Sequence, residues 1–118
     1  MKYMLLLTDD PQQGAQPGTH AHDEEMQAWF AYTDALVKAG AMVGGEALHG
    51  PETATTVTVR DGGRVVTDGP FIESKEVLGG YYIIDVPDLD TAIDWAARTP
   101  NVRTGSVEIR PVMDLGDS

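Results

Sequence analysis

The chain has 118 residues, 42% of them hydrophobic and 23% charged, which fits one globular domain and leaves no room for two separate cores. Its formal net charge of −11 would repel a phosphate backbone, so nucleic acid is not expected as a partner. It contains no cysteine, which excludes disulfides, thiolate catalysis and sulfur-rich metal sites.

The first expected element is a buried strand over residues 2–7. This stretch is apolar on both faces, which is typical of a strand at the centre of a sheet. It is too short for a signal peptide, and Asp9-Asp10-Pro11 follows where a small-residue cleavage site would stand. No run approaches the ~20 apolar residues that cross a bilayer, so we expect a cytoplasmic protein with no membrane partner.

Residues 8–22 are rich in Gly, Pro, Gln and Asp and predict a long loop. Residues 23–39 predict a helix, because acidic residues at its start suit the helix dipole and Gly40 suits its end. Its apolar positions recur at three- and four-residue steps and predict one buried face, formed by Met26, Trp29, Phe30, Thr33, Leu36 and Val37.

The rest of the chain predicts five strands and a short helix. A strand over residues 42–48 is loosened by Gly44 and Gly45. Residues 55–60 and 64–67 flank the hairpin signal Asp61-Gly62-Gly63. Further strands are expected over residues 79–86 and 106–111. Between them Asp88 is the expected N-cap of a helix whose buried stripe is Leu89, Ala92, Ile93 and Ala96.

The order β-α-β, hairpin, β-α-β predicts an α+β, ferredoxin-like plait with an antiparallel sheet and two helices on one face. The opposite face would carry Tyr3, Leu5 and Leu7, or the residues that alternate with them, and it needs cover. A second copy of the chain provides that cover most simply, so we expect a homodimer.

Several stretches resemble one known family. They are Met1–Leu6, Pro51–Val57, the Asp68-Gly69-Pro70-Phe71 motif with the segment to Glu76, Leu78–Val86 and Val107–Val112. The chain thereby resembles the YCII-related (DGPF-domain) family over its whole length, as one domain spanning residues 1–118. The resemblance implies a dimeric α/β-barrel assembly around a cleft. Relatives include cofactor-free oxygenases and lyases acting on small ring compounds, and genes of DGPF proteins often lie beside those of extracytoplasmic-function sigma factors.

The histidines depart from the family pattern. The broader family tends to carry a histidine on the first helix, paired with an aspartate as a proposed catalytic dyad. The helix predicted over residues 23–39 contains no histidine, and His20 and His22 fall on the loop before it. The dyad is therefore not carried over. The His-x-His spacing matches no recognised metal motif, and no metal site is predicted.

Asp68 and His49 are the candidate catalytic residues. In the Asp68-Gly69-Pro70-Phe71 turn, proline fixes the backbone and Phe71 anchors it, so the Asp68 carboxylate could act as a general base or bind a ligand. The alternative is a structural turn in which Asp68 caps backbone amides. His49 could serve as a general base near neutral pH, or be an incidental loop histidine.

Phe71, Glu73, Lys75, Glu108 and Arg110 are the candidate substrate-binding residues. Lys75 offers a positive charge for an anionic group, although Glu73 and Lys75 could simply form a solvated loop. Glu108 and Arg110 share one face of the last strand, where they form either a ligand contact or a structural ion pair.

The chain contains no GxGxxG, P-loop or GxSxG motif, so nucleotide binding and serine-hydrolase chemistry have no support. The leading hypothesis is a site for a small ring-containing or acidic ligand in the dimer cleft, using acid–base chemistry without an organic cofactor. The alternative is a regulatory or accessory binding protein without turnover, linked to sigma-factor regulation.

Overall fold

The computed structural model describes residues 1–10, 18–69 and 77–115. Its elements follow the order β1 (Lys2–Asp9), α1 (His20–Lys38), β2 (Met42–Ala47), a short 3₁₀ turn η1 (Pro51–Thr53), β3 (Thr55–Arg60), β4 (Gly63–Asp68), β5 (Val77–Asp85), α2 (Leu89–Ala97) and β6 (Gly105–Pro111). Every predicted strand and helix is present, with ends shifted by at most three residues.

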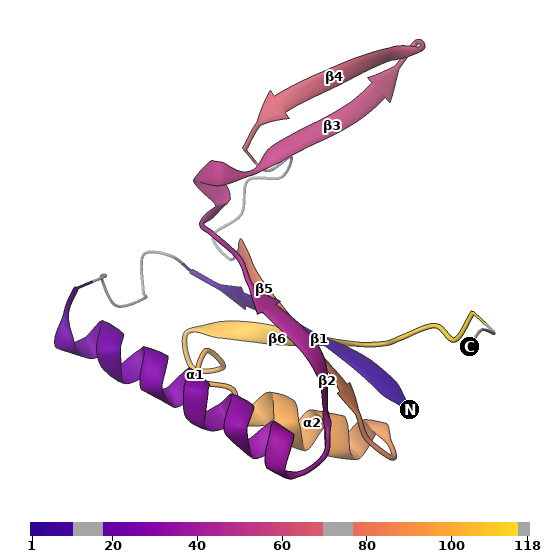
Figure 1. Ribbon diagram of the computed structural model, residues 1–118. Coiled ribbons are helices and arrows are strands. Elements are labelled where there is room, and N and C mark those ends of the chain that lie inside the picture. The colour runs from indigo at the N-terminus through magenta and orange to yellow at the C-terminus, as the bar shows by residue number, and fades with distance from the viewer. Residues whose placement is uncertain (11–17, 70–76, 116–118) are drawn as a thin grey trace.

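Four strands form an antiparallel sheet in the order β2-β5-β1-β6, and α1 and α2 cover the same face of it (Figure 1). This is the predicted ferredoxin-like arrangement. The strand β1 lies at the centre between β5 and β6, as its apolar sequence on both faces predicted. No helix among the described residues is long and apolar enough to cross a membrane.

The core lies between the sheet and the two helices. The side chains of Tyr3, Leu5 and Leu7 point to this side and are buried against residues of α1 and α2. The alternating residues Met4 and Leu6 therefore occupy the face without helices, where they are partly exposed. The members of the buried cluster are Tyr3, Leu5, Leu7, Tyr32, Leu36, Ala41, Tyr82, Ile84, Val86, Ala92, Trp95 and Ala96.

The helix α1 begins three residues earlier than its sequence pattern indicated. The Thr19 hydroxyl accepts a hydrogen bond from the His22 amide at 3.1 Å, which is a favourable N-cap. At the other end, Gly40 has φ of 72°, and its amide donates to Val37 while the Ala41 amide donates to Leu36. This pair of bonds is a Schellman motif, so the predicted stop at Gly40 is confirmed.

The buried faces of both helices differ from the predicted ones. On α1, Leu36 is buried as expected, whereas Met26, Phe30 and Val37 remain exposed. On α2, the predicted Asp88 cap is confirmed, and its carboxylate accepts from the Thr91 amide at 2.8 Å. The prediction that Leu89 and Ile93 are buried is wrong. The buried stripe of α2 is Ala92, Trp95 and Ala96, because the Trp95 indole packs edge-on against Tyr32.

The strands β3 and β4 form a separate two-stranded sheet that projects from the body of the protein (Figure 1), and we call residues 55–68 the arm. Its turn has positive φ at Asp61 (51°) and Gly62 (76°), and the pairing of Arg60 with Gly63 gives the predicted hairpin a two-residue loop. With the arm extended, the molecule measures 48 × 46 × 18 Å.

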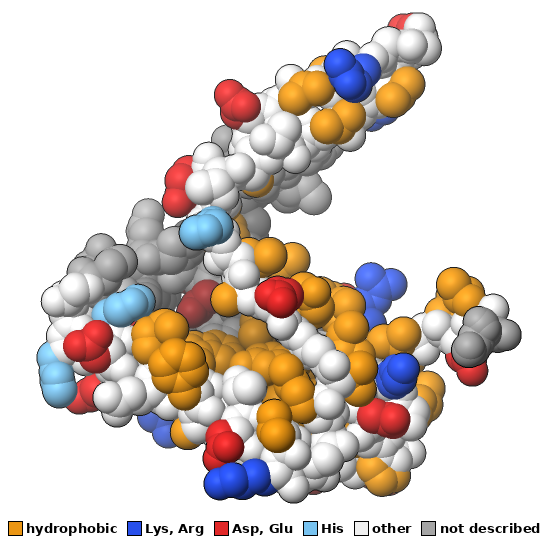
Figure 2. Space-filling model, viewed as in Figure 1, with side chains coloured by type: hydrophobic (Ala, Val, Ile, Leu, Met, Phe, Trp, Pro, Cys, Tyr) orange, Lys and Arg blue, Asp and Glu red, His pale blue; other side chains and the backbone are white. Residues whose placement is uncertain are grey.

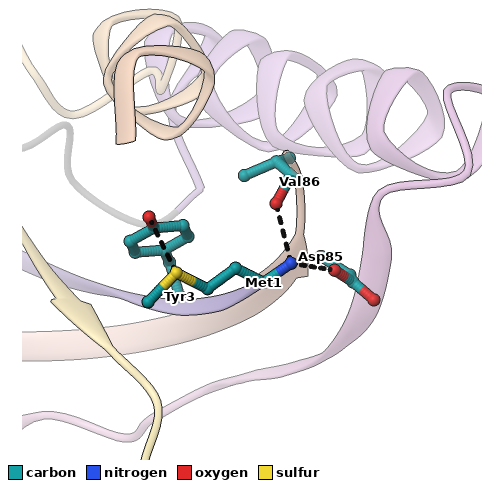
Figure 3. A network of polar contacts seen from close by, with 4 residues as sticks. All are labelled: Met1, Tyr3, Asp85 and Val86. Atoms are coloured by element: carbon teal, nitrogen blue, oxygen red, sulfur yellow. Dashed lines mark hydrogen bonds and ion pairs between the residues drawn. The ribbon is translucent and has the colours of Figure 1, made fainter. Parts of the chain in front are cut away.

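The first residue of the chain is fastened to the end of β5 (Figure 3). The amino group of Met1 lies 2.9 Å from the Asp85 carboxylate and 2.9 Å from the Val86 carbonyl oxygen. The Tyr3 hydroxyl donates to the Met1 sulfur at 3.3 Å. These contacts hold the start of β1 in register against β5.

Candidate functional site

A cavity of about 420 Å³ lies between the N-terminal half of α1 and the sheet. In Figure 2 the hollow is bordered mainly by hydrophobic side chains. The helix contributes Met26, Trp29, Phe30 and Thr33, which follow the three- and four-residue spacing of one helical face. This is the face that the sequence predicted to be buried in the core.

The cavity exists because two positions of the sheet opposite α1 are glycines. Gly45 of β2 pairs with Tyr82 of β5, and Gly80 of β5 pairs with Ala47 of β2, so the sheet carries no side chain at these two positions. A Cβ atom at Gly45 would lie 2.7 Å from the Tyr81 carbonyl oxygen, which is too close for a larger residue. The apolar face of α1 therefore borders an open space, and Met26 and Phe30 stay exposed.

One wall of the cavity is aromatic. The rings of Trp29 and Tyr82 are stacked at 6.3 Å with an interplanar angle of 20°, and Tyr32 packs edge-on against both. The Tyr82 hydroxyl and the Thr33 hydroxyl lie 2.6 Å apart and form a hydrogen bond. This wall offers a flat apolar surface with a polar edge, which suits a planar ring that carries oxygen substituents.

A carboxylate lies at the end of the cavity. Asp9, the last residue of β1, lines the cavity, and its Oδ1 accepts hydrogen bonds from the Thr104 hydroxyl and the Asp10 amide, each at 3.0 Å. Within the described part of the chain its Oδ2 accepts no hydrogen bond, which leaves that oxygen able to act on a ligand proton.

Asn101 fixes the backbone around this carboxylate. Its side-chain amide donates to the carbonyl oxygens of Thr8 (2.9 Å) and Ser106 (3.2 Å), which joins β1 to β6 next to Asp9. Asn101 also lines the cavity and is buried. Its Oδ1 has no hydrogen-bond partner among the described residues.

The histidines at the start of α1 belong to the helix and not to the loop before it, which corrects the predicted boundary. His20 Nε2 pairs with Glu24 at 2.7 Å, and both side chains are exposed. His22 is partly buried and precedes Met26, Trp29 and Thr33 by four, seven and eleven residues. That spacing places His22 on the cavity side of α1, one turn beyond Met26. The described residues contain no cluster of three or more His, Cys, Asp or Glu that would hold a metal ion.

Four of the site residues predicted from the sequence lie in the described part of the chain, and all four are away from the cavity. Asp68 ends the arm, and its exposed carboxylate makes no hydrogen bond or ion pair with any described residue. His49 follows β2 and is exposed. Glu108 and Arg110 lie on the sheet face without helices, 3.8 Å apart and largely exposed. None of these four residues lines the cavity. Phe71, Glu73 and Lys75 lie outside the described residues.

The sequence did contain a signal for the cavity. Gly44-Gly45 and Gly79-Gly80 are consecutive glycines in β2 and β5, two strands that pair with each other. In the sequence, Gly44 and Gly45 indicated only a loosened strand. Combined with the strand order, they identify the place where a helix face has nothing to pack against. Asp9, Trp29, Thr33 and Tyr82 then follow as the side chains around that place.

Three comparisons place the chain among known proteins. The family model described as "YCII-related domain" matches residues 1–116. An uncharacterised protein of Rhizobium meliloti is 33% identical over 114 residues, which cover 95% of this chain and 92% of that protein. In fold, the chain is similar to 5-chloro-2-hydroxyhydroquinone dehydrochlorinase of Burkholderia phenoliruptrix, solved in complex with 2,5-dihydroxybenzoquinone. That match has a TM-score of 0.54 and 14% identity, and it covers 96% of this chain and 94% of the other.

Proposed function

The chain belongs to the YCII-related domain family, and from that premise we propose that it binds a small planar ring compound in the cavity beside α1. There it transfers protons to or from the ligand by acid–base chemistry, without an organic cofactor. The observation that carries this proposal is the combination of a stacked Trp29–Tyr82 wall with the oriented Asp9 carboxylate at the end of a largely apolar cavity, whose lining also includes Glu46.

The roles of the side chains follow from their positions. Trp29 and Tyr82 hold the ring, and the Thr33–Tyr82 hydroxyl pair bonds to an oxygen substituent on it. Asp9 accepts a proton from a ring hydroxyl or an acidic C–H group on Oδ2 and returns it to the product, while the bonds to Oδ1 keep the carboxylate oriented.

His22 is the second candidate for proton transfer. The resemblance to the family implies a histidine on the first helix paired with an aspartate, and the observed start of α1 brings His22 into that helix. We propose His22 and Asp9 as the acid–base pair of this cavity.

The similar fold of the dehydrochlorinase supports a ring compound as the ligand class, because that protein was solved with a hydroxylated quinone. At 14% identity this is an analogy of fold, and the argument for this chain rests on its own cavity. The reaction proposed here is therefore limited to proton transfer on a hydroxylated ring.

We also propose a homodimer. The sheet face without helices carries the partly exposed Met4, Leu6, Tyr81 and Ile83. A second copy would cover this apolar strip, and the Glu108–Arg110 pair would then lie at the edge of the contact. The site predicted around Asp68, with His49, Phe71, Glu73 and Lys75, remains a separate proposal.

A matched pair of Asp→Asn substitutions tests which carboxylate belongs to the site. Wild type, Asp9→Asn and Asp68→Asn are compared by calorimetric titration and by turnover with a panel of hydroxylated benzenes and quinones. Asp9→Asn keeps the shape of the side chain and an acceptor oxygen for Thr104. We expect it to retain binding and lose proton transfer by at least about 10²-fold, while Asp68→Asn behaves as wild type.

Trp29→Ala provides the second arm of the test, since it removes the stacking surface and should abolish binding. If Asp68→Asn is the variant that loses activity, the site lies at the base of the arm and the cavity assignment is wrong. If no compound of the panel binds the wild type, the chemistry proposed here fails. An accessory binding function without turnover then becomes the better explanation.

A further inference from the structure

Asp9 has one unused carboxylate oxygen at the end of the cavity. Its Oδ1 accepts hydrogen bonds from the Thr104 hydroxyl and the Asp10 amide, each at 3.0 Å. Within the described residues its Oδ2 accepts none, and Asp9 lines the cavity and is partly buried. A partly buried carboxylate interacts with the charge of a ligand more strongly than one in open water, because less solvent screens it. This end of the cavity therefore favours a hydrogen-bond donor or a cation.

Asn101 provides a second unused acceptor. Its amide group donates to two backbone carbonyl oxygens, those of Thr8 at 2.9 Å and Ser106 at 3.2 Å, and Thr8 is the residue before Asp9. The Asn101 side chain lines the cavity and is buried, and its Oδ1 has no hydrogen-bond partner among the described residues. A buried acceptor without a partner is costly, so a ligand donor that reaches this oxygen gains affinity.

The charged residues around the cavity are acidic. Asp9 and Glu46 are the charged residues among the described lining, and Glu46 is exposed, so water screens its charge. The chain has eight Lys and Arg residues. All of them except Lys75 lie in the described part of the chain, and none of those lines the cavity. The net charge of −11 adds a field that attracts cations and repels anions.

The aromatic residues of the cavity favour the same sign of ligand charge. Trp29, Phe30 and Tyr82 line it, and the rings of Trp29 and Tyr82 lie within 20° of parallel. The face of an aromatic ring attracts a cation, because its quadrupole is negative there. An ammonium group in this cavity would thus be attracted by the rings and by Asp9. A carboxylate would lose its hydration without gaining a described cation as a partner.

We propose that the cavity selects its ring ligand by charge, binding a ring that carries a protonated amino group and excluding the same ring with a carboxylate. The ammonium group donates to Asp9 Oδ2 and to Asn101 Oδ1. Its three N–H donors can serve both acceptors, which a single hydroxyl proton cannot. This inference rests on the ring-binding cavity proposed above. It narrows the ligand class expected from the sequence, where an acidic ligand in contact with Lys75 remained open.

Calorimetric titration with three forms of one phenol tests the selection. At about pH 8, para-hydroxybenzylamine is a cation, para-hydroxybenzyl alcohol is neutral and para-hydroxybenzoate is an anion, while an unperturbed imidazole is neutral. The Kd of the amine should be at least about fivefold lower than that of the alcohol, and the Kd of the benzoate at least about tenfold higher. Raising the salt concentration from about 50 mM to about 500 mM should narrow the gap between amine and benzoate.

Asp9→Asn tests the source of the selection, and Asp61→Asn is its matched control. Both substitutions remove one negative charge. Asp61 lies in the turn of the arm with φ of 51°, a conformation that asparagine tolerates. Asp9→Asn should abolish the preference for the amine over the alcohol, whereas Asp61→Asn should keep the order of the wild type. The ligand series on the wild type needs no substitution, so it carries the test if Asp9→Asn does not fold.

The trimethylated form of the amine tests the second acceptor. It keeps the positive charge but has no N–H group to donate, so it should bind at least about fivefold more weakly than the parent amine. Binding as tight as that of the amine would overturn the role given to Asn101.

Two results would overturn the charge selection. They are an amine that binds no more tightly than the alcohol, and a benzoate that binds at least as tightly as the alcohol. If the affinity for the benzoate is then lost in Lys75→Gln, the positive contact expected from the sequence holds an anionic ligand instead. In each of these cases a ring compound still binds, and the proposed function stands. If none of the three phenols binds the wild type, the ring-binding cavity fails together with its selectivity.

Discussion

Replacing Tyr32 by Phe tests the packing beneath the aromatic wall. The Tyr32 side chain is 5% exposed, and its hydroxyl donates to the Trp95 carbonyl oxygen at 2.9 Å. That carbonyl also accepts from the Arg98 amide at 3.1 Å, so it keeps one partner in the variant. The loss in free energy of unfolding should therefore be that of one ordinary hydrogen bond, about 1 kcal/mol. For a domain of this size, such a loss corresponds to a decrease in Tm of about 4 °C.

The effect of Tyr32→Phe should change with pH. Burial, reinforced by the neighbouring Tyr82, raises the pKa of Tyr32 well above its usual value. In the unfolded chain the same phenol ionises near pH ~10, so above that pH the folded wild type binds more protons than the unfolded chain. Because of Tyr32, the free energy of unfolding of the wild type then falls by about 1.4 kcal/mol per pH unit. The Phe variant lacks this phenol and has no such loss. The difference in free energy of unfolding between the two proteins should reach zero between about pH 10.5 and 11.

Urea unfolding of both proteins at pH 7, 9, 10 and 11 measures this difference directly, because contributions from all other groups cancel in the comparison. Two outcomes would contradict the reasoning. A gap that stays constant up to pH 11 would mean that Tyr32 ionises as easily in the folded protein as in the unfolded one. A loss above about 3 kcal/mol at pH 7 would mean that the Trp95 carbonyl was left without a partner.

Three further substitutions test other parts of the fold. Leu36→Ala removes a fully buried side chain and should cost about 2–5 kcal/mol in urea unfolding; a loss below 1 kcal/mol would show that the core closes over the gap. Gly105→Ala should lower Tm strongly, because the new Cβ would overlap the Thr8 carbonyl oxygen, while a neutral result would show that β6 can shift away from β1. Asp88→Ala removes the cap of α2 and should lower Tm at neutral pH. The Thr91 hydroxyl and amide lower the pKa of the Asp88 carboxyl, so its stabilisation is present at neutral pH and lost in acid. The difference from wild type should therefore shrink at low pH, and an unchanged difference would refute the role of the charge.

Local signals in the sequence predicted the local features well. The Asp61-Gly62 turn, the Asp88 cap and the Gly40 stop each depend on residues a few positions apart, and all three are confirmed. The start of α1 was missed because its cap, Thr19, lies inside a stretch whose Gly and Pro content indicated a loop. That error also removed His22 from the helix.

The cavity could not be located without the sheet register. Met26 and Phe30 have the spacing of core residues, and nothing within α1 distinguishes an apolar face that meets a partner from one that borders a space. The distinction comes from Gly45 and Gly80, which lie on different strands and face α1 only because β2 pairs with β5. Asp9 was missed for a similar reason, since Thr104, which orients its carboxylate, is 95 residues away.

The projecting arm also affects how the mass of this protein would be judged in solution. The radius of gyration is 16.4 Å, whereas a compact chain of this length would have about 13.5 Å. A gel-filtration column separates by hydrodynamic size, so a monomer with an extended arm would elute early, in the direction of a dimer. Elution volume alone would then overstate the mass of the monomer, and light scattering or sedimentation would be needed to tell it from a dimer.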